Sequence, residues 1–235
     1  MSQDLEALIS GRFDELADGP MFPQDIPPDD FALKAALEWW GDLRGRLLLD
    51  VGCAKGRFVR ALSAAGARVI GTDRTWKMIQ AASGGQRNSS FVLSTATRLP
   101  FADACYDGLL CVEVIEHIPE TDLAFAEMAR VLKPGGQAII IDKNLLGIGY
   151  NRLYPNWIYK GVMERLGRWS YPRDFPFRER WFVAPSIRRA LRRHFSDVEI
   201  RYLDGRVQGV RRRLLAPLFK LVPILRPDVA WCCRK

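Results

Sequence analysis

The chain has 235 residues, of which 48% are hydrophobic and 26% are charged. This length fits one α/β domain with additions and leaves little room for a second full domain. No stretch approaches the ~18 uninterrupted apolar residues of a transmembrane helix, and the polar first residues do not resemble a signal peptide, so we expect a cytoplasmic protein. The five cysteines are irregularly spaced without a CxxC pair, which argues against a disulfide framework or a zinc site.

Charge is divided unevenly along the chain. Residues 1–143 contain 15 Lys and Arg against 20 Asp and Glu, whereas residues 144–235 contain 20 against 7. The acidic part suits a cationic small molecule. The basic part suits an anionic partner, which could be a phosphorylated or carboxylated substrate, a nucleic acid or a membrane surface.

Two helices and a linker are predicted first. Residues 3–18 are predicted to form an amphipathic helix because apolar residues recur near helical spacing. Four prolines within 19–28 predict an irregular linker, and a second helix is expected over about 31–42. We therefore expect an N-terminal helical extension over 1–45 and one main domain over 46–235.

Short apolar strands alternate with helices after residue 46. Strands are predicted at 47–51, 68–72, 91–93, 106–114 and 137–142, and helices at about 56–65, 75–82 and 120–132. This alternation predicts βαβ units and a parallel sheet. After an irregular segment at 144–182, a helix is expected over 184–195 and two more strands over 198–203 and 229–233.

The first predicted strand runs into a glycine-containing turn, Asp50-Val-Gly-Cys-Ala-Lys-Gly56. Glycines at this position allow the backbone to approach a ligand, and the following helix offers free N–H groups. The second strand ends at Asp73, where a carboxylate can accept hydrogen bonds from both ribose hydroxyls of a nucleotide. The turn has no G-x-G-x-x-G, which argues against a dinucleotide.

Five segments in correct order resemble the motifs of the class I S-adenosyl-L-methionine-dependent methyltransferases, over about residues 45–143. They are Leu48–Gly56, Gly71–Asp73, Leu99–Asp107, Glu113–Ile118 and Leu132–Gly136. The most similar branch is the small-molecule group that includes ubiquinone-type (methyltransferase type 11) and natural-product enzymes. The resemblance implies a Rossmann-like, doubly wound, seven-stranded α/β sheet, with 229–233 antiparallel between strands five and six. It also implies S-adenosyl-L-methionine as the cofactor.

The resemblance assigns the methionine and ribose parts of the cofactor to the first two strand ends. Backbone at Gly52 and its neighbours Cys53 and Gly56 would hold the methionine part. Asp50 would help to organise the amino group, and Asp73 would bind the ribose.

The rest of the cofactor site is assigned in the same way. Arg74 would pack along the adenine, and Thr95 and Ala96 would face its edge. The family often has Asp where this chain has Thr95, and a hydroxyl accepts more weakly than a carboxylate. Val112 and Glu113 would end the fourth strand at the mouth of the pocket.

The pattern E-x-x-E-H at Glu113, Glu116 and His117 supplies the catalytic candidates. It resembles ubiquinone-type O-methyltransferases, in which equivalent residues are associated with a divalent metal. The same pattern is widespread without metal, and His117 could serve as a general base or have a structural role. We take His117 and Glu113 as the catalytic candidates and assign no metal. His194 is expected at the surface.

Residues 144–182 are predicted to form a substrate-lid insertion after strand five. Aromatic and basic residues alternate within 150–182: Tyr150, Arg152, Tyr154, Trp157, Tyr159, Lys160, Arg165, Arg168, Trp169, Tyr171, Arg173, Phe175, Phe177, Arg178, Arg180, Trp181 and Phe182. Such a lid suits an acidic, aromatic or lipid-like acceptor. It could also stack single-stranded RNA or form a satellite core with its arginines reaching the solvent.

Residues 211–226 combine four arginines with an apolar run and two prolines. This segment could rest on an anionic membrane, or it could pack over the sheet. The favoured function is O-methylation of a small, anionic or lipid-like acceptor in small-molecule biosynthesis. The alternatives are an RNA methyltransferase that uses the basic half, although nucleic acid is the less favoured partner, and a non-catalytic binding module.

Overall fold

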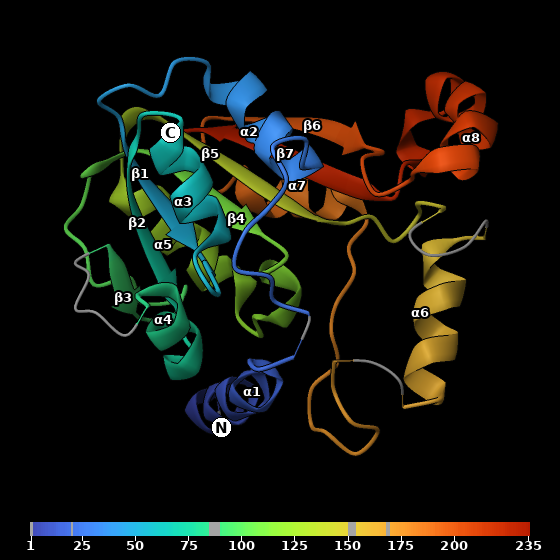
Figure 1. Ribbon diagram of the computed structural model, residues 1–235, viewed down its shortest axis with the longest axis horizontal. Coiled ribbons are helices and arrows are strands. Elements are labelled where there is room, and N and C mark those ends of the chain that lie inside the picture. The colour runs from blue at the N-terminus through green and yellow to red at the C-terminus, as the bar shows by residue number, and fades with distance from the viewer. Residues whose placement is uncertain (1, 20, 85–89, 150–153, 168–169) are drawn as a thin grey trace.

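The computed structural model describes residues 2–19, 21–84, 90–149, 154–167 and 170–235. Its centre is a seven-stranded sheet with the order β3-β2-β1-β4-β5-β7-β6 (Figure 1). The strands are β1 (Leu47–Val51), β2 (Arg68–Asp73), β3 (Phe91–Leu93), β4 (Tyr106–Val112), β5 (Leu132–Lys143), β6 (Asp197–Leu203) and β7 (Asp228–Arg234). This is the doubly wound Rossmann-like arrangement that the sequence predicted.

Helices cover both faces of the sheet. The helices are α1 (Ser2–Leu16), α2 (Phe31–Trp40), α3 (Arg57–Ala64), α4 (Trp76–Ala82), α5 (Thr121–Val131), α6 (Asn156–Arg165), α7 (Ala184–Leu191) and α8 (Gly209–Leu221). One apolar core joins the sheet to α2, α3 and α4. The other joins it to α5 and α7. Because both faces are covered, the central strands are apolar without alternation.

The last strand, β7, is inserted antiparallel between β5 and β6, as the resemblance implied. All of its residues from Asp228 to Cys233 are buried. Trp231 is the largest fully buried side chain, and its indole Nε1 donates to the Ala184 carbonyl at 2.9 Å. The C-terminal segment therefore belongs to the middle of the fold.

Two strand boundaries differ from the prediction by more than one residue. β4 ends at Val112 rather than at 114 because Glu113 adopts a left-handed conformation with φ of 57°. β5 begins at Leu132 rather than at 137, since Leu132 already pairs with Tyr106 before an irregularity in the register. The Lys133–Gly136 turn therefore lies within β5.

The segments after β5 hold two helices that the sequence did not predict as such. Helix α6 lies inside the expected irregular insertion, and α8 continues through Pro217. Both lie at one end of the longest axis of the molecule, away from the packed helices (Figure 1). Among the described residues, no helix is both long and apolar enough to cross a membrane.

Candidate active site

A cavity of about 640 Å³ lies at the carboxyl ends of the parallel strands. Parallel α/β sheets bind ligands at this edge because neighbouring strands diverge into different loops there. Its wall comes from the β1, β2 and β4 ends, from α1 and the linker after it, and from β5 and the insertion. Cofactor candidates in the wall are Gly52, Cys53, Asp73, Arg74, Thr95, Ala96, Val112 and Glu113, and His117 is in the wall as well.

The turn after β1 is compact. Gly52 has φ of 75°, and a Cβ there would lie 2.2 Å from a Val114 methyl carbon, so only glycine fits. The Gly52 and Cys53 amides donate to the Thr72 carbonyl at 2.7 and 2.8 Å. This ties the β1 turn to the end of β2. Gly56 has φ of 80° at the start of α3 and does not line the cavity.

The two acidic candidates occupy different positions. Asp73 reaches the cavity, and its carboxylate accepts from the Ala54 and Thr75 amides, both at 2.9 Å. It therefore caps the local backbone and keeps further lone pairs for a ligand. Asp50 is 1% exposed behind the turn. Burial, and then the charge of Asp73, raises the pKa of Asp50 to about 7, against the effect of Arg57.

The third strand end is joined to α1. The Thr97 amide donates to Thr95 Oγ1 at 3.0 Å, and the Thr97 hydroxyl contacts Glu6 Oε1 at 3.2 Å. Arg74 donates through Nε to Ser10 Oγ at 2.9 Å and through its terminal nitrogen to the Glu6 carbonyl. Arg74 is thus held by α1 while it lines the cavity. Glu6 was not predicted as a site residue, and a helix preceding a proline linker gives no signal for it.

The residues at this end fit the nucleoside part of S-adenosyl-L-methionine. Ser94 Oγ lines the cavity, is buried and has no hydrogen-bond partner within the described part of the chain. Asp50 Oδ2 is also buried and unpaired among those residues. A buried polar atom without a partner is costly, so Ser94 Oγ suits a hydrogen bond with a ligand in the cavity. Asp73 and Ser94 would hold the ribose and adenine, whereas Asp50, expected to organise the amino group, does not line the cavity.

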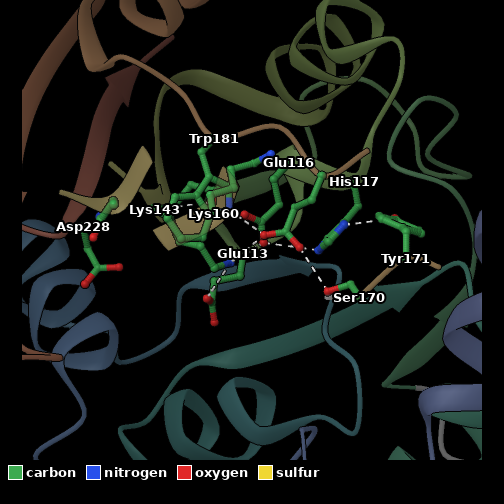
Figure 2. A network of polar contacts seen from close by, with 12 residues as sticks. Glu113, Glu116, His117, Lys143, Lys160, Ser170, Tyr171, Trp181 and Asp228 are labelled. Carbon is green, nitrogen blue, oxygen red and sulfur yellow. Dashed lines mark hydrogen bonds and ion pairs between the residues drawn. The ribbon is translucent and has the colours of Figure 1, made fainter. Parts of the chain in front are cut away.

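The other end of the cavity contains a buried ammonium surrounded by carboxylates (Figure 2). Lys143 Nζ, at the end of β5, lies 3.0 Å from Glu113 Oε1 and 3.7 Å from Glu179 Oε1, and it also pairs with Glu116. Arg206 extends the cluster, at 2.7 Å from Glu113. The unusual backbone of Glu113 aims its side chain into this cluster.

The Lys143 cluster (Glu113, Glu116, Lys143, Glu179 and Arg206) sets the charge of its members. Burial opposes ionisation of Glu113, but Arg206 and Lys143 outweigh it and lower the pKa to about 2. Burial likewise opposes ionisation of Glu116, but Lys143 and His117 hold its pKa well below the usual range. Burial and Glu116 raise the pKa of Glu179. The Lys143 ammonium is retained because three carboxylates outweigh its burial.

His117 lies between this cluster and the insertion (Figure 2). Its Nε2 is 3.2 Å from Glu116 Oε1, and its Nδ1 is 3.0 Å from the Tyr171 hydroxyl. Phe13 of α1 packs edge-on against the imidazole, with ring centroids 4.9 Å apart. Glu116 thus orients the imidazole and can stabilise its protonated form.

The grouping of potential metal ligands differs from the E-x-x-E-H set. Glu116, His117 and Glu179 have ligand atoms within 4.8 Å of one another, whereas Glu113 faces Lys143 and Arg206. Sequence reasoning missed Lys143, Glu179 and Arg206. Only Lys143 had a local signal, as a basic residue that ends an apolar strand.

The expected lid is only partly at the cavity. Tyr159, Ser170 and Glu179 line it. Arg178 instead donates to the Pro172 and Arg173 carbonyls at an exposed position. Tyr150, Arg152, Arg168 and Trp169 lie outside the described residues. His194 pairs with Asp122 on α5, away from the cavity.

Comparison with known proteins agrees with this architecture. Residues 49–140 match the model of the family described as methyltransferase domain. An uncharacterized methyltransferase of Mycobacteroides abscessus is 39% identical over 103 residues, which cover 42% of this chain and 40% of the relative. One of Mycobacterium sp. (strain JLS) is 35% identical over 144 residues, which cover 60% and 56%. The chain thus spans about half the length of these curated relatives, or less.

A solved structure extends the likeness over nearly the whole chain. Phosphoethanolamine N-methyltransferase 2 of Haemonchus contortus, in complex with phosphomonomethylethanolamine and S-adenosylhomocysteine, superposes with a TM-score of 0.64 at 19% identity. The match covers 97% of this chain and 57% of that one. At this identity it shows the fold. Residues 49–140 thus match a methyltransferase domain, and the chain as a whole has the fold of S-adenosyl-L-methionine-dependent methyltransferases.

Proposed function

We propose that the chain transfers the methyl group of S-adenosyl-L-methionine to a hydroxyl oxygen of a small aromatic or lipid-like acceptor. The observation that carries the proposal is the continuity of one cavity. Asp73 and Ser94 at its nucleoside end and His117 at its other end line the same space. A cofactor held by the first group would present its sulfonium toward the second.

When bound, the cofactor supplies a methyl group on an excellent leaving group, so the protein must align the acceptor and remove its proton. In this proposal the acceptor hydroxyl takes the place of the Tyr171 hydroxyl at Nδ1 of His117 and gives its proton to that nitrogen. Glu116 accepts from Nε2 and stabilises the imidazolium. Because the pKa of Glu116 is held well below its usual range, its carboxylate is ionised at neutral pH.

The lining of the cavity favours an aromatic or lipid-like acceptor over a strongly acidic one. Apolar and aromatic side chains face it: Phe13, Met21, Phe22, Phe58 and Tyr159. Arg206 pairs with Glu113 at 2.7 Å, and Arg57 is 3.8 Å from the same carboxylate. An anionic acceptor would have to compete with Glu113 for them. In this proposal the extension 1–45 and the insertion 144–182, which is part of the domain 46–235, cover the cavity formed by the strand ends of that domain.

The proposal requires no metal. Lys143 places a positive charge among Glu113, Glu116 and Glu179, where a divalent ion would otherwise be needed to balance the carboxylates. Turnover should therefore persist in excess chelator.

The test is a single-residue comparison with labelled cofactor and a fractionated metabolite extract, in which methylated products are identified by mass spectrometry. His117→Gln should lower kcat by about 10²–10⁴-fold, the usual contribution of a general base, and leave S-adenosylhomocysteine affinity nearly unchanged. His194→Gln is the matched control. If His117→Gln keeps the kcat of the wild type, His117 is not the general base. If the wild type does not bind S-adenosylhomocysteine, the whole proposal is wrong. Methylation of RNA in a parallel reaction would contradict the small acceptor.

A further inference from the structure

Helix α8 exposes an apolar stripe. Val210, Leu214, Pro217 and Leu221 recur at i, i+4, i+7 and i+11, so they lie along one side of the helix. Val210 is 69% exposed, Leu214 63% and Leu221 82%, whereas only Phe219 is buried. The helix is thus attached through its opposite side, and its most apolar line faces outward.

Positive charge borders this stripe. At 100° per residue, Arg213 and Lys220 lie along one edge of the stripe and Arg211 lies toward the other. Helix α8 contains no Asp or Glu. Exposed apolar side chains bordered by cations alone are the pattern of a helix that lies in the plane of an anionic membrane surface.

Helix α6 and the residue after it add further exposed apolar side chains at the same end of the molecule (Figure 1). Trp157 is 55% exposed, Val162 47% and Leu166 59%, and Arg165 is exposed among them. The one acidic residue of α6, Glu164, is paired with Lys160 at 2.5 Å. A tryptophan beside aliphatic residues is the composition that settles at the level of lipid headgroups.

We propose that α6 and α8 together form a docking face for an anionic lipid bilayer. The pattern fits a bilayer better than other occupants. A second copy packed face to face would bring two arginine clusters together. Nucleic acid would engage the cations and leave the aliphatic stripe in water. A bilayer accepts the stripe among its acyl chains and the cations at its headgroups. The inference does not depend on methyl transfer.

The experiment is flotation of the full chain with vesicles of phosphatidylcholine, with or without phosphatidylglycerol, followed by the fluorescence of Trp157. We expect binding only with phosphatidylglycerol, binding that weakens as salt is raised, and a blue shift that is lost in Trp157→Phe. Leu214→Ser/Leu221→Ser and Arg213→Gln/Lys220→Gln should each lower the partition at least tenfold, since each cation near such a surface is worth about fivefold. The matched controls are Leu123→Ser, which is 52% exposed on α5, and Arg189→Gln/Arg192→Gln on the α7 side.

Three results would overturn the proposal. The first is an absence of binding to phosphatidylglycerol vesicles. The second is equal binding by Leu214→Ser/Leu221→Ser and Leu123→Ser. The third is a dimer in light scattering that the Leu214→Ser/Leu221→Ser variant abolishes, which would assign the face to a second copy of the chain. Because these substitutions are at exposed positions, circular dichroism should show a folded protein in every case.

Discussion

Lys143 is the residue on which the charge balance of the cavity depends. It is 5% exposed and touches three carboxylates. A buried charge persists only when partners compensate for lost hydration. Lys143 in turn stabilises Glu113 and Glu116. Without its positive charge, these two carboxylates would repel each other in a site that is largely shielded from water.

Lys143→Met should therefore lower the free energy of unfolding by about 3–5 kcal/mol near neutral pH. The loss should shrink as the pH falls. In the wild type the lowered pKa of Glu116 gives stability that is present above the unfolded value and lost on acidification. In the variant the unpaired carboxylates take up protons instead. Urea denaturation at several pH values measures the loss of unfolding free energy and its dependence on pH.

Lys133→Met is the control, because Lys133 is 45% exposed and pairs with Asp107 at 2.6 Å. Its loss should cost at most about 1 kcal/mol. If Lys143→Met and Lys133→Met lose the same free energy of unfolding, the buried Lys143 cluster contributes no more to stability than an exposed ion pair.

Asp50 gives a second residue-scale prediction. Its folded pKa is raised to about 7, whereas an unfolded Asp titrates near 3.9. The folded state thus loses stability as pH rises from about 4 to about 7, because the unfolded Asp is ionised in this range while the buried carboxyl keeps its proton. Asp50→Asn should gain about 2–4 kcal/mol over the wild type across that window and keep the gain above it. Asp29→Asn, in the exposed linker, should show no such window. A gain independent of pH would contradict the buried-carboxyl explanation.

At the scale of elements, α1 is the part that closes the nucleoside end. Glu6 and Phe13 line the cavity, and Arg74 is bonded to the α1 backbone. Deletion of residues 2–18 should raise the dissociation rate of S-adenosylhomocysteine at least tenfold, because its pocket would open to water. Stopped-flow displacement measures the rate. Glu15→Gln, which loses only an exposed pair with Arg12, should leave it unchanged. An unchanged rate in the deletion would assign closure to another segment.

The sequence predicted the strands better than the segments after β5. Apolar blocks bounded by glycine and acidic residues mark buried strands, and the turn at Gly52 and the acid at Asp73 are local features. Helices α6 and α8 were missed because Gly161 and Pro217 interrupt the pattern that predicts helices. Neither helix has a continuous buried face, so hydrophobic periodicity could not mark it.

The two ends of the cavity also differed in predictability. The cofactor candidates come from one motif each. The Lys143 cluster joins residues from the loop after β4, the end of β5, the insertion and the loop after β6. The positions of Glu179 and Arg206 in the sequence do not predict that these residues lie near Glu113 in the fold. Such a cluster exists only once the sheet order is known.

For the molecule as a whole, β7 is the strand that unites the two halves of the chain. Trp231→Ala should lower the free energy of unfolding by about 3–5 kcal/mol, since it leaves a large cavity and frees the Ala184 carbonyl. Trp157→Ala, at a 55% exposed position, should change it by less than about 0.5 kcal/mol. Denaturation followed by circular dichroism gives the free energy of unfolding of each variant. Similar free energies for Trp231→Ala and Trp157→Ala would place Trp231 outside the cooperative core.

The position of β7 also has a consequence for how the chain reaches its folded state. Asp142 of β5 pairs with Val229 of β7, and the insertion, α7, β6 and α8 lie between them in the chain. Closing so long a loop is entropically costly and slows folding. Until it closes, Ile139, Ile140 and Ile141 form an open, apolar strand edge, which is the kind of edge that pairs with other chains. Refolding of this protein should therefore compete with aggregation, and dilution should favour the native state.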